Sequence, residues 1–221
     1  MVYIYLHALC HYERKLSNPF FSLPTESQDD NSVYDLFELA RVSRLNNGVR
    51  MVKGQDPYSI AYKVLNAEMI PQLPDSSLRD LLDSIQAERG FLLLLNLKQL
   101  KNSRGHILTI EKKDGSGAIF EIISNGRQNS LDVVYTTLNH KHTVSIEDAD
   151  LATGQWKNIT LFVQDDQVQL YVGCDEINVA EMEVSIQKVL TQGVADIARL
   201  RIAKGAPGDR FTVRAKVFKL C

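Results

Sequence analysis

Hydrophobic and polar residues alternate with a period of two along most of the chain after about residue 33. Residues 130–138, 159–164 and 168–173 combine this alternation with many β-branched and aromatic side chains, which favour strands. Turn-forming residues separate the segments, namely residues 114–117, 125–126, 165–166 and 205–208. The pattern predicts an all-β fold, an antiparallel β-sandwich built from short strands.

One segment has helical periodicity instead. Leu78, Leu81, Leu82 and Ile85 follow the i, i+3, i+4, i+7 spacing of a single helix face. The spacing predicts one amphipathic helix near residues 76–89, with Asp75 as its N-cap and Gly90 closing its C-terminus. Because it stands alone between strands, we expect it at an edge or rim of the sandwich. Residues 185–190 predict a further short turn of helix.

The chain of 221 residues is long enough for one large β domain. Residues 1–29 contain Pro19, Pro24 and a polar run, and we expect an irregular N-terminal arm there and the domain over 30–221. In a secretory signal, basic residues precede the apolar segment, but no basic residue precedes the apolar N-terminus here. The longest apolar run, 91–95, is far shorter than the roughly 20 residues that cross a bilayer, so no membrane insertion is expected.

Basic residues are concentrated in three windows, although the net charge is −2. Residues 40–55 and 89–110 contain four basic residues each and no acid, and residues 197–221 contain seven basic residues and one acid. Fields decay over about 8 Å at physiological ionic strength, so a polyanion would meet these windows rather than the average charge.

The alternation in two late segments places cations on one face. Arg199 and Arg201 alternate with apolar residues, as do Arg214 and Lys216. For any single strand, a solvated face that discourages edge-to-edge aggregation explains the same pattern.

A turn near residue 100 gathers three further cations. If residues 91–97 and 107–111 pair as a hairpin, Lys98, Lys101 and Arg104 surround its turn. Such a cluster suits sulfate or phosphate groups. A nucleic acid is the weaker candidate ligand, because the basic windows lack interleaved aromatic residues for base stacking.

Signals for catalysis are weak. His140 and His142 would share a face of an extended segment, but no third metal ligand accompanies them, and we expect a solvated turn there. Glu111 and Asp114 are expected to be surface groups rather than a catalytic pair. We therefore expect no enzyme activity, cofactor or metal.

The three cysteines, Cys10, Cys174 and Cys221, leave two arrangements open. A Cys174–Cys221 disulfide would contribute about 4 kcal/mol in the chain-entropy model, and three thiols in a reducing compartment are the alternative. The triplet Asn158-Ile159-Thr160 is an N-glycosylation acceptor, which points to an extracellular protein.

Six motifs, in the same order over about 180 residues, resemble one known family. They are DNSVYDLFEL (30–39), KGQDP (53–57), AERGFLLL (87–94), SRG (103–105), ATGQWKNITLFV (152–163) and IARLRIAKG (197–205). The sequence resembles the N-terminal domain of thrombospondins, particularly the trimeric type. The resemblance implies a concanavalin or laminin-G-like sandwich of the jelly-roll kind, secreted into the extracellular matrix.

The resemblance also implies ligands and the residues that contact them. It implies binding of heparin and heparan sulfate proteoglycans. The residues that it implies as heparin contacts are Arg50, Lys63, Lys98, Lys101 and Arg104. Lys63 and Lys98 stand where relatives have arginine, and lysine lacks the bidentate fork.

Receptor partners are implied as well. Residues 38–56, with Arg44 and Lys53, resemble a calreticulin-binding region, and Glu111 resembles an integrin contact. The integrin motif Leu-Asp-Val-Pro of relatives reads MEVS (182–185) here, so that site is not carried over. Cys174 matches a disulfide cysteine of the family, with Cys221 as its candidate partner. A trimer is expected only with a coiled coil outside this chain.

The leading hypothesis is a secreted adhesion module that binds sulfated glycosaminoglycans, with receptor contacts as a second activity. The alternative is a protein-interaction domain whose main ligand is calreticulin or an integrin, with only weak glycosaminoglycan binding.

Overall fold

The computed structural model describes residues 34–43, 48–55, 58–137, 140–191, 193–204 and 213–220, with only the backbone described for residues 67 and 213–220. The predicted arm at 1–29 and the predicted turn at 205–208 lie outside the described residues. The boundary between arm and domain therefore stays a prediction.

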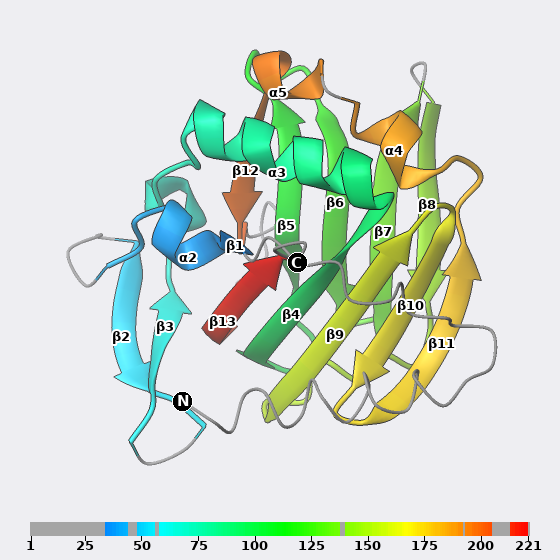
Figure 1. The fold of residues 1–221 in the computed structure, drawn as a ribbon. Helices are drawn as coiled ribbons and strands as arrows, with labels where there is room; N and C mark the ends of the chain where they lie inside the picture. Colours follow the sequence, from blue (N-terminus) through cyan, green and yellow to red (C-terminus); the bar gives the residue numbers. More distant parts are fainter. Residues whose placement is uncertain are drawn as a thin grey trace, which may run out of the picture.

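Two antiparallel sheets face each other in the described structure (Figure 1). Sheet A, with eight strands, has the order β11-β10-β9-β4-β13-β3-β2, and β1 also pairs with β13. Its strands are β1 (Tyr34–Asp35), β2 (Val49–Lys53), β3 (Ile60–Val64), β4 (Gly90–Gln99), β9 (Trp156–Gln164), β10 (Gln167–Val172), β11 (Asp175–Glu181) and β13 (Val213–Leu220).

Sheet B, with five strands, has the order β12-β5-β6-β7-β8. Its strands are β5 (Arg104–Lys112), β6 (Ala118–Asn125), β7 (Ser130–Thr137), β8 (His140–Ile146) and β12 (Ala198–Ile202). The core fills the space between the sheets, with Leu93 and Leu161 from sheet A and Phe120 and Val133 from sheet B all at most 1% exposed. The predicted antiparallel β-sandwich is confirmed.

Helix α3 (Asp75–Glu88) confirms the predicted amphipathic helix, because its four periodic apolar residues are all buried. Both predicted caps were wrong. Pro74 is the N-cap, while Asp75 lies inside the helix and its carboxylate is 2.8 Å from Lys113 Nζ. Arg89 closes the other end with φ 59°, and its N–H donates to the carbonyl of Ile85. Gly90 begins β4 instead, where a Cβ would lie 2.2 Å from the Val163 carbonyl oxygen.

The remaining helices are short. They are α2 (Leu36–Leu39), the 3-10 helix η1 (Ala67–Met69), α4 (Ile186–Val189) and α5 (Val194–Ile197). Helix α4 confirms the prediction for residues 185–190. Helices α3, α4 and α5 lie together at one end of the sandwich (Figure 1).

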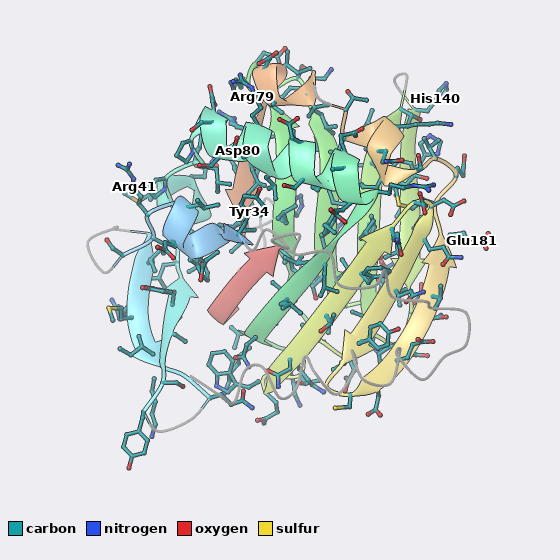
Figure 2. The ribbon with its side chains drawn as sticks, in the orientation of Figure 1. Tyr34, Arg41, Arg79, Asp80, His140 and Glu181 are labelled. Atoms are coloured by element: carbon teal, nitrogen blue, oxygen red, sulfur yellow. The ribbon has the colours of Figure 1, made fainter. Side chains whose placement is uncertain are left out.

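Tyr34 fixes β1 to the long helix. Its hydroxyl donates to the backbone carbonyl of Asp80 over 3.2 Å and lies 2.8 Å from Ser84 Oγ, and Figure 2 labels Tyr34 and Asp80 beside each other. Strand β1 also pairs with β13, where Tyr34 lies opposite Leu220. The strand therefore connects α3 to sheet A.

Residues 91–97 and 107–111 do not pair as the hairpin that was considered from the sequence. Strand β4 pairs with β9 and β13 in sheet A, whereas β5 pairs with β6 and β12 in sheet B. Residues 100–103 therefore cross from one sheet to the other. The fully buried Gln99 holds this crossing in place. Its side-chain Nε2 donates to the backbone carbonyl of Ser103 over 2.9 Å, and its backbone carbonyl accepts from the Gly154 N–H.

Candidate functional site

Four basic positions on neighbouring strands of sheet A are in register. Arg50 lies opposite Lys63, Lys63 opposite Arg214, and Arg214 opposite Lys98. Directly paired residues of antiparallel strands project from the same face of a sheet. At about 4.8 Å between strands, the four backbone positions form a line about 14 Å long. We call Arg50, Lys63, Arg214 and Lys98 the basic row.

The basic row belongs to the outer face of sheet A. On β4, Leu95 and Leu97 point into the core and are at most 4% exposed, so Lys98, which follows Leu97, points outward. The Arg50 side chain is exposed, and the Lys63 and Lys98 side chains are half-buried. For position 214, the backbone register gives the place in the row.

No acid of the described chain neutralises the described side chains of this row. Arg50, Lys63 and Lys98 take part in none of the ion pairs within 4.0 Å that the described residues form. Within the described part of the chain, these three positive charges therefore have no counter-ion.

An amide cluster lies beside the basic row on the same face. Lys98 is opposite Trp156, and two residues along the strands Asn96 is opposite Asn158. The Nδ2 of Asn96 donates to Oδ1 of Asn158 and, over 2.8 Å, to Oε1 of Gln55. We call Gln55, Asn96 and Asn158 the amide cluster. Cations, amides and one indole ring therefore share a continuous patch of the outer face.

Lys101 and Arg104 lie apart from the row. Lys101 is exposed in the turn that follows β4. Arg104 begins β5 in sheet B opposite Asn125, and its Nε is buried with no hydrogen-bond partner in the described structure. Of the five residues predicted to bind heparin, three are in register on sheet A, Lys101 is in the adjacent turn and Arg104 is in the other sheet.

The cations of β12 are already paired. The Nε atoms of Arg199 and Arg201 each lie 2.7 Å from Glu111 Oε1, and Lys204 Nζ lies 2.8 Å from Oε2. The alternation predicted for this strand is confirmed, since Leu200 is buried between the two arginines. We call Glu111, Arg199, Arg201 and Lys204 the Glu111 cluster.

Glu111 is 7% exposed, so its expected position as a surface group was wrong. Burial alone would raise the pKa of its carboxyl, but hydrogen bonds from Lys204 and Arg199, with the nearby charges of Lys204 and Arg201, outweigh burial and hold that pKa below its ordinary value. The carboxylate is therefore ionised and neutralised within the fold.

A second carboxylate of sheet B is held in the same way. Glu121 is 6% exposed, and it lies 3.0 Å from His106 Nδ1 and 3.6 Å from Lys141 Nζ. Burial opposes ionisation of Glu121, while the His106 hydrogen bond and the charges of His106 and Lys141 lower its pKa below the ordinary value.

The histidine pair lies in a strand, so the expected solvated turn was wrong. His140 and His142 belong to β8. The His142 ring stacks on Tyr135 with 5.0 Å between ring centroids, and its Nδ1 is 3.2 Å from Glu183. No group of three or more His, Cys, Asp or Glu side chains among the described residues could hold a metal ion.

The other predicted site residues are spread over the molecule. Lys53 is exposed at the end of β2, and Arg44 lies outside the described residues. Cys174 is half-buried in the turn between β10 and β11. Cys221 lies outside the described residues, so its disulfide with Cys174 stays a prediction; its neighbour Leu220 is opposite Leu93 of β4, with β9 between β4 and β10.

Sequence reasoning missed two members of the patch. Arg214 was recognised as a cation on one face of a strand but not joined to Lys63 and Lys98, and Trp156 was not considered as a site residue. The alternation along each strand gives the face of a residue. The pairing between distant strands, which aligns these residues, is a property of the fold.

Comparison with known proteins finds relatives among the thrombospondins. The chain is 52% identical to thrombospondin-1 of Xenopus laevis over 188 residues, which is 83% of the chain and 16% of that protein. It is 34% identical to thrombospondin-2 of Homo sapiens over 179 residues, covering 81% of the chain and 15% of that protein. The chain thus spans about a sixth of the length of these relatives. No protein-family model matches.

A solved structure supports the fold. The binding domain of Paraclostridial Mosquitocidal Protein 1 superposes with a TM-score of 0.52 at 14% identity, over 79% of this chain and 42% of that one. No helix in the described part of the chain is both long and apolar enough to span a membrane.

Proposed function

We propose that this chain, which belongs to the thrombospondin family by homology over 83% of its length, is a secreted, noncatalytic adhesion module of the extracellular matrix that binds heparin and heparan sulfate. The homology to thrombospondins supports an adhesion-type module. The observation that carries the choice of ligand is the basic row, in which Arg50, Lys63, Arg214 and Lys98 are aligned across four neighbouring strands.

A line of cations on a rigid sheet suits a linear polyanion. Each sulfate or carboxylate of the glycan that meets a cation releases counterions, which favours binding at low salt. Arginine offers a planar fork to a sulfate, whereas lysine offers a point charge. The half-buried Trp156, next to Lys98 at the end of the row, adds an apolar ring face on which a sugar can lie. Lys101 extends the positive charge beyond the end of β4.

Receptor binding is the second candidate function. Lys53 is exposed, which favours a protein contact such as calreticulin at the end of β2. An integrin contact through Glu111 has less support, because a receptor would have to separate this 7% exposed carboxylate from cations that lie 2.7 to 2.8 Å away. We therefore rank glycosaminoglycan binding first.

Heparin chromatography with a salt gradient tests the proposal. The wild-type chain should elute well above physiological salt, and Arg50→Ala plus Lys98→Ala should elute close to it. Arg79→Ala plus Lys188→Ala removes the same net charge from α3 and α4 and should elute like the wild type. Elution of the wild type at physiological salt, or equal losses in both double variants, would refute the proposal.

A further inference from the structure

We propose that Asn158 carries an N-linked glycan that covers one end of the basic row, so that glycosylation of this residue weakens binding of the polyanion. The inference rests on the proposed function, since it concerns the regulation of the same surface. It joins two observations, the acceptor triplet Asn158-Ile159-Thr160 and the place of Asn158 on sheet A.

Asn158 projects from the same face as the basic row. On β9, Ile159 and Leu161 point into the core and are at most 2% exposed, so Asn158 and Thr160 point outward. Asn158 is paired with Asn96, and Lys98 lies two residues further along β4. With about 3.4 Å per residue and about 4.8 Å between strands, the backbones of Asn158 and Lys98 are about 8 Å apart.

The atom that would carry the glycan is Nδ2 of Asn158, a half-buried residue. Asn158 accepts the hydrogen bond from Asn96 through its Oδ1, and its Nδ2 makes no hydrogen bond with any described residue. An N-linked glycan is attached to Nδ2 and leaves Oδ1 as an acceptor, so the bond to Asn96 can persist after modification. Threonine at the third position and isoleucine at the second satisfy the acceptor rule.

A glycan at this position must lie over the patch. N-glycans are bulky and well hydrated. Asn158 lies on the strand next to Lys98, two residues along from it, and two residues after Trp156 on β9. A glycosaminoglycan chain that follows the row would meet the N-glycan at the Lys98 end. The glycosylated protein can therefore use the Arg50 and Lys63 end only, which leaves fewer cations in contact with the polyanion.

Two substitutions of Thr160 provide a matched pair for the test. Thr160→Ser keeps the acceptor triplet, while Thr160→Ala removes it, and both leave Asn158 in place. Both variants and the wild type are secreted from eukaryotic cells, the glycan is measured by intact mass, and heparin affinity is measured over a range of salt concentrations. Thr160→Ala should bind heparin about tenfold more tightly than glycosylated Thr160→Ser, with a salt slope steeper by about 1 to 2.

Enzymatic trimming gives a second readout that does not depend on the fold of a variant. An endoglycosidase that leaves a single sugar on Asn158 keeps the residue uncharged, and trimming the wild type should raise its heparin affinity toward that of Thr160→Ala. Absence of a glycan on secreted wild type, or equal heparin affinity with and without the glycan, would overturn the inference while the proposed function stands. Failure of unglycosylated Thr160→Ala to bind heparin would overturn both.

Discussion

The outer faces of both sheets carry basic residues, but the described cations of the two sheets have different surroundings. On sheet A, no described acid lies within 4.0 Å of Arg50, Lys63 or Lys98. On sheet B, Arg199 and Arg201 share one oxygen of Glu111, which is 7% exposed. The first group has no counter-ion among the described residues, whereas the second already shares one.

The comparison shows that the density of basic residues in a sequence does not give the charge that a ligand meets. The window of residues 197–221 is the most basic of the three, yet Arg199, Arg201 and Lys204 are all hydrogen-bonded to Glu111. A buried carboxylate holds the cations around it in ion pairs. The charge of those cations is then neutralised within the fold.

The largest expected effect is on the Glu111 cluster. Glu111→Gln leaves the three cations near a neutral amide, and since breaking a buried ion pair leaves uncompensated charge, we expect a loss of about 3 kcal/mol in the free energy of unfolding. Urea denaturation at pH 7 measures the loss. Glu147→Gln, at an exposed position after β8, is the matched control and should leave the midpoint unchanged. A Glu111→Gln midpoint equal to that of the wild type would show that the cluster is not structural.

Acid should abolish the difference between these two proteins. The pKa of Glu111 is lowered in the folded state from its usual 4.5, so its contribution to stability is complete above about pH 4.5 and is lost as the pH falls through the lowered pKa. The gap between wild type and Glu111→Gln, measured by urea midpoints from pH 7 downward, should be constant to about pH 4.5 and then shrink. A gap that widens in acid would have the wrong sign for this account.

The binding face should respond in the opposite way, with lost affinity and unchanged stability. Arg50→Ala plus Lys98→Ala removes two contacts of the basic row, so heparin affinity should fall about tenfold or more and the salt slope should fall by about 2. The free energy of unfolding from urea denaturation should stay within about 0.5 kcal/mol of wild type, because neither side chain forms an ion pair or hydrogen bond with a described residue. Lost affinity that came with a large loss of stability would contradict the division between the two faces.

The smallest expected effect concerns Arg104, because it belongs to sheet B. Arg104→Ala should change heparin affinity less than Lys98→Ala does, by about twofold or less, since it lies off the basic row. Side-by-side titrations of the two single variants make the comparison. A larger loss for Arg104→Ala would move the binding surface toward the rim between the sheets.

The sequence supports correct statements about single segments. Alternation predicted the strands around residues 130–138, 159–164 and 168–173, and the spacing of Leu78, Leu81, Leu82 and Ile85 predicted α3. These signals are local, because one buried face repeats every two or 3.6 residues. They are sufficient for an antiparallel sandwich with one long helix.

The pairing of strands that are distant in the sequence could not be predicted in the same way. The placing of the cations around residue 100 assumed a hairpin of residues 91–97 and 107–111, but the chain crosses from sheet A to sheet B at the buried Gln99 and Ser103. Alternation could not decide this, since it gives a face for each strand and no partner. For the same reason the alignment of Arg50, Lys63, Arg214 and Lys98 depends on the pairing of β2, β3, β13 and β4.

A crystal structure of the chain with a sulfated heparin oligosaccharide would test the central claim most directly. We predict that the oligosaccharide crosses β2, β3, β13 and β4 along the outer face of sheet A, with sulfate groups at Arg50, Lys63 and Lys98, and that the Glu111 cluster is unchanged. An oligosaccharide bound across sheet B, with Arg199 and Arg201 turned away from Glu111 toward sulfates, would contradict the account.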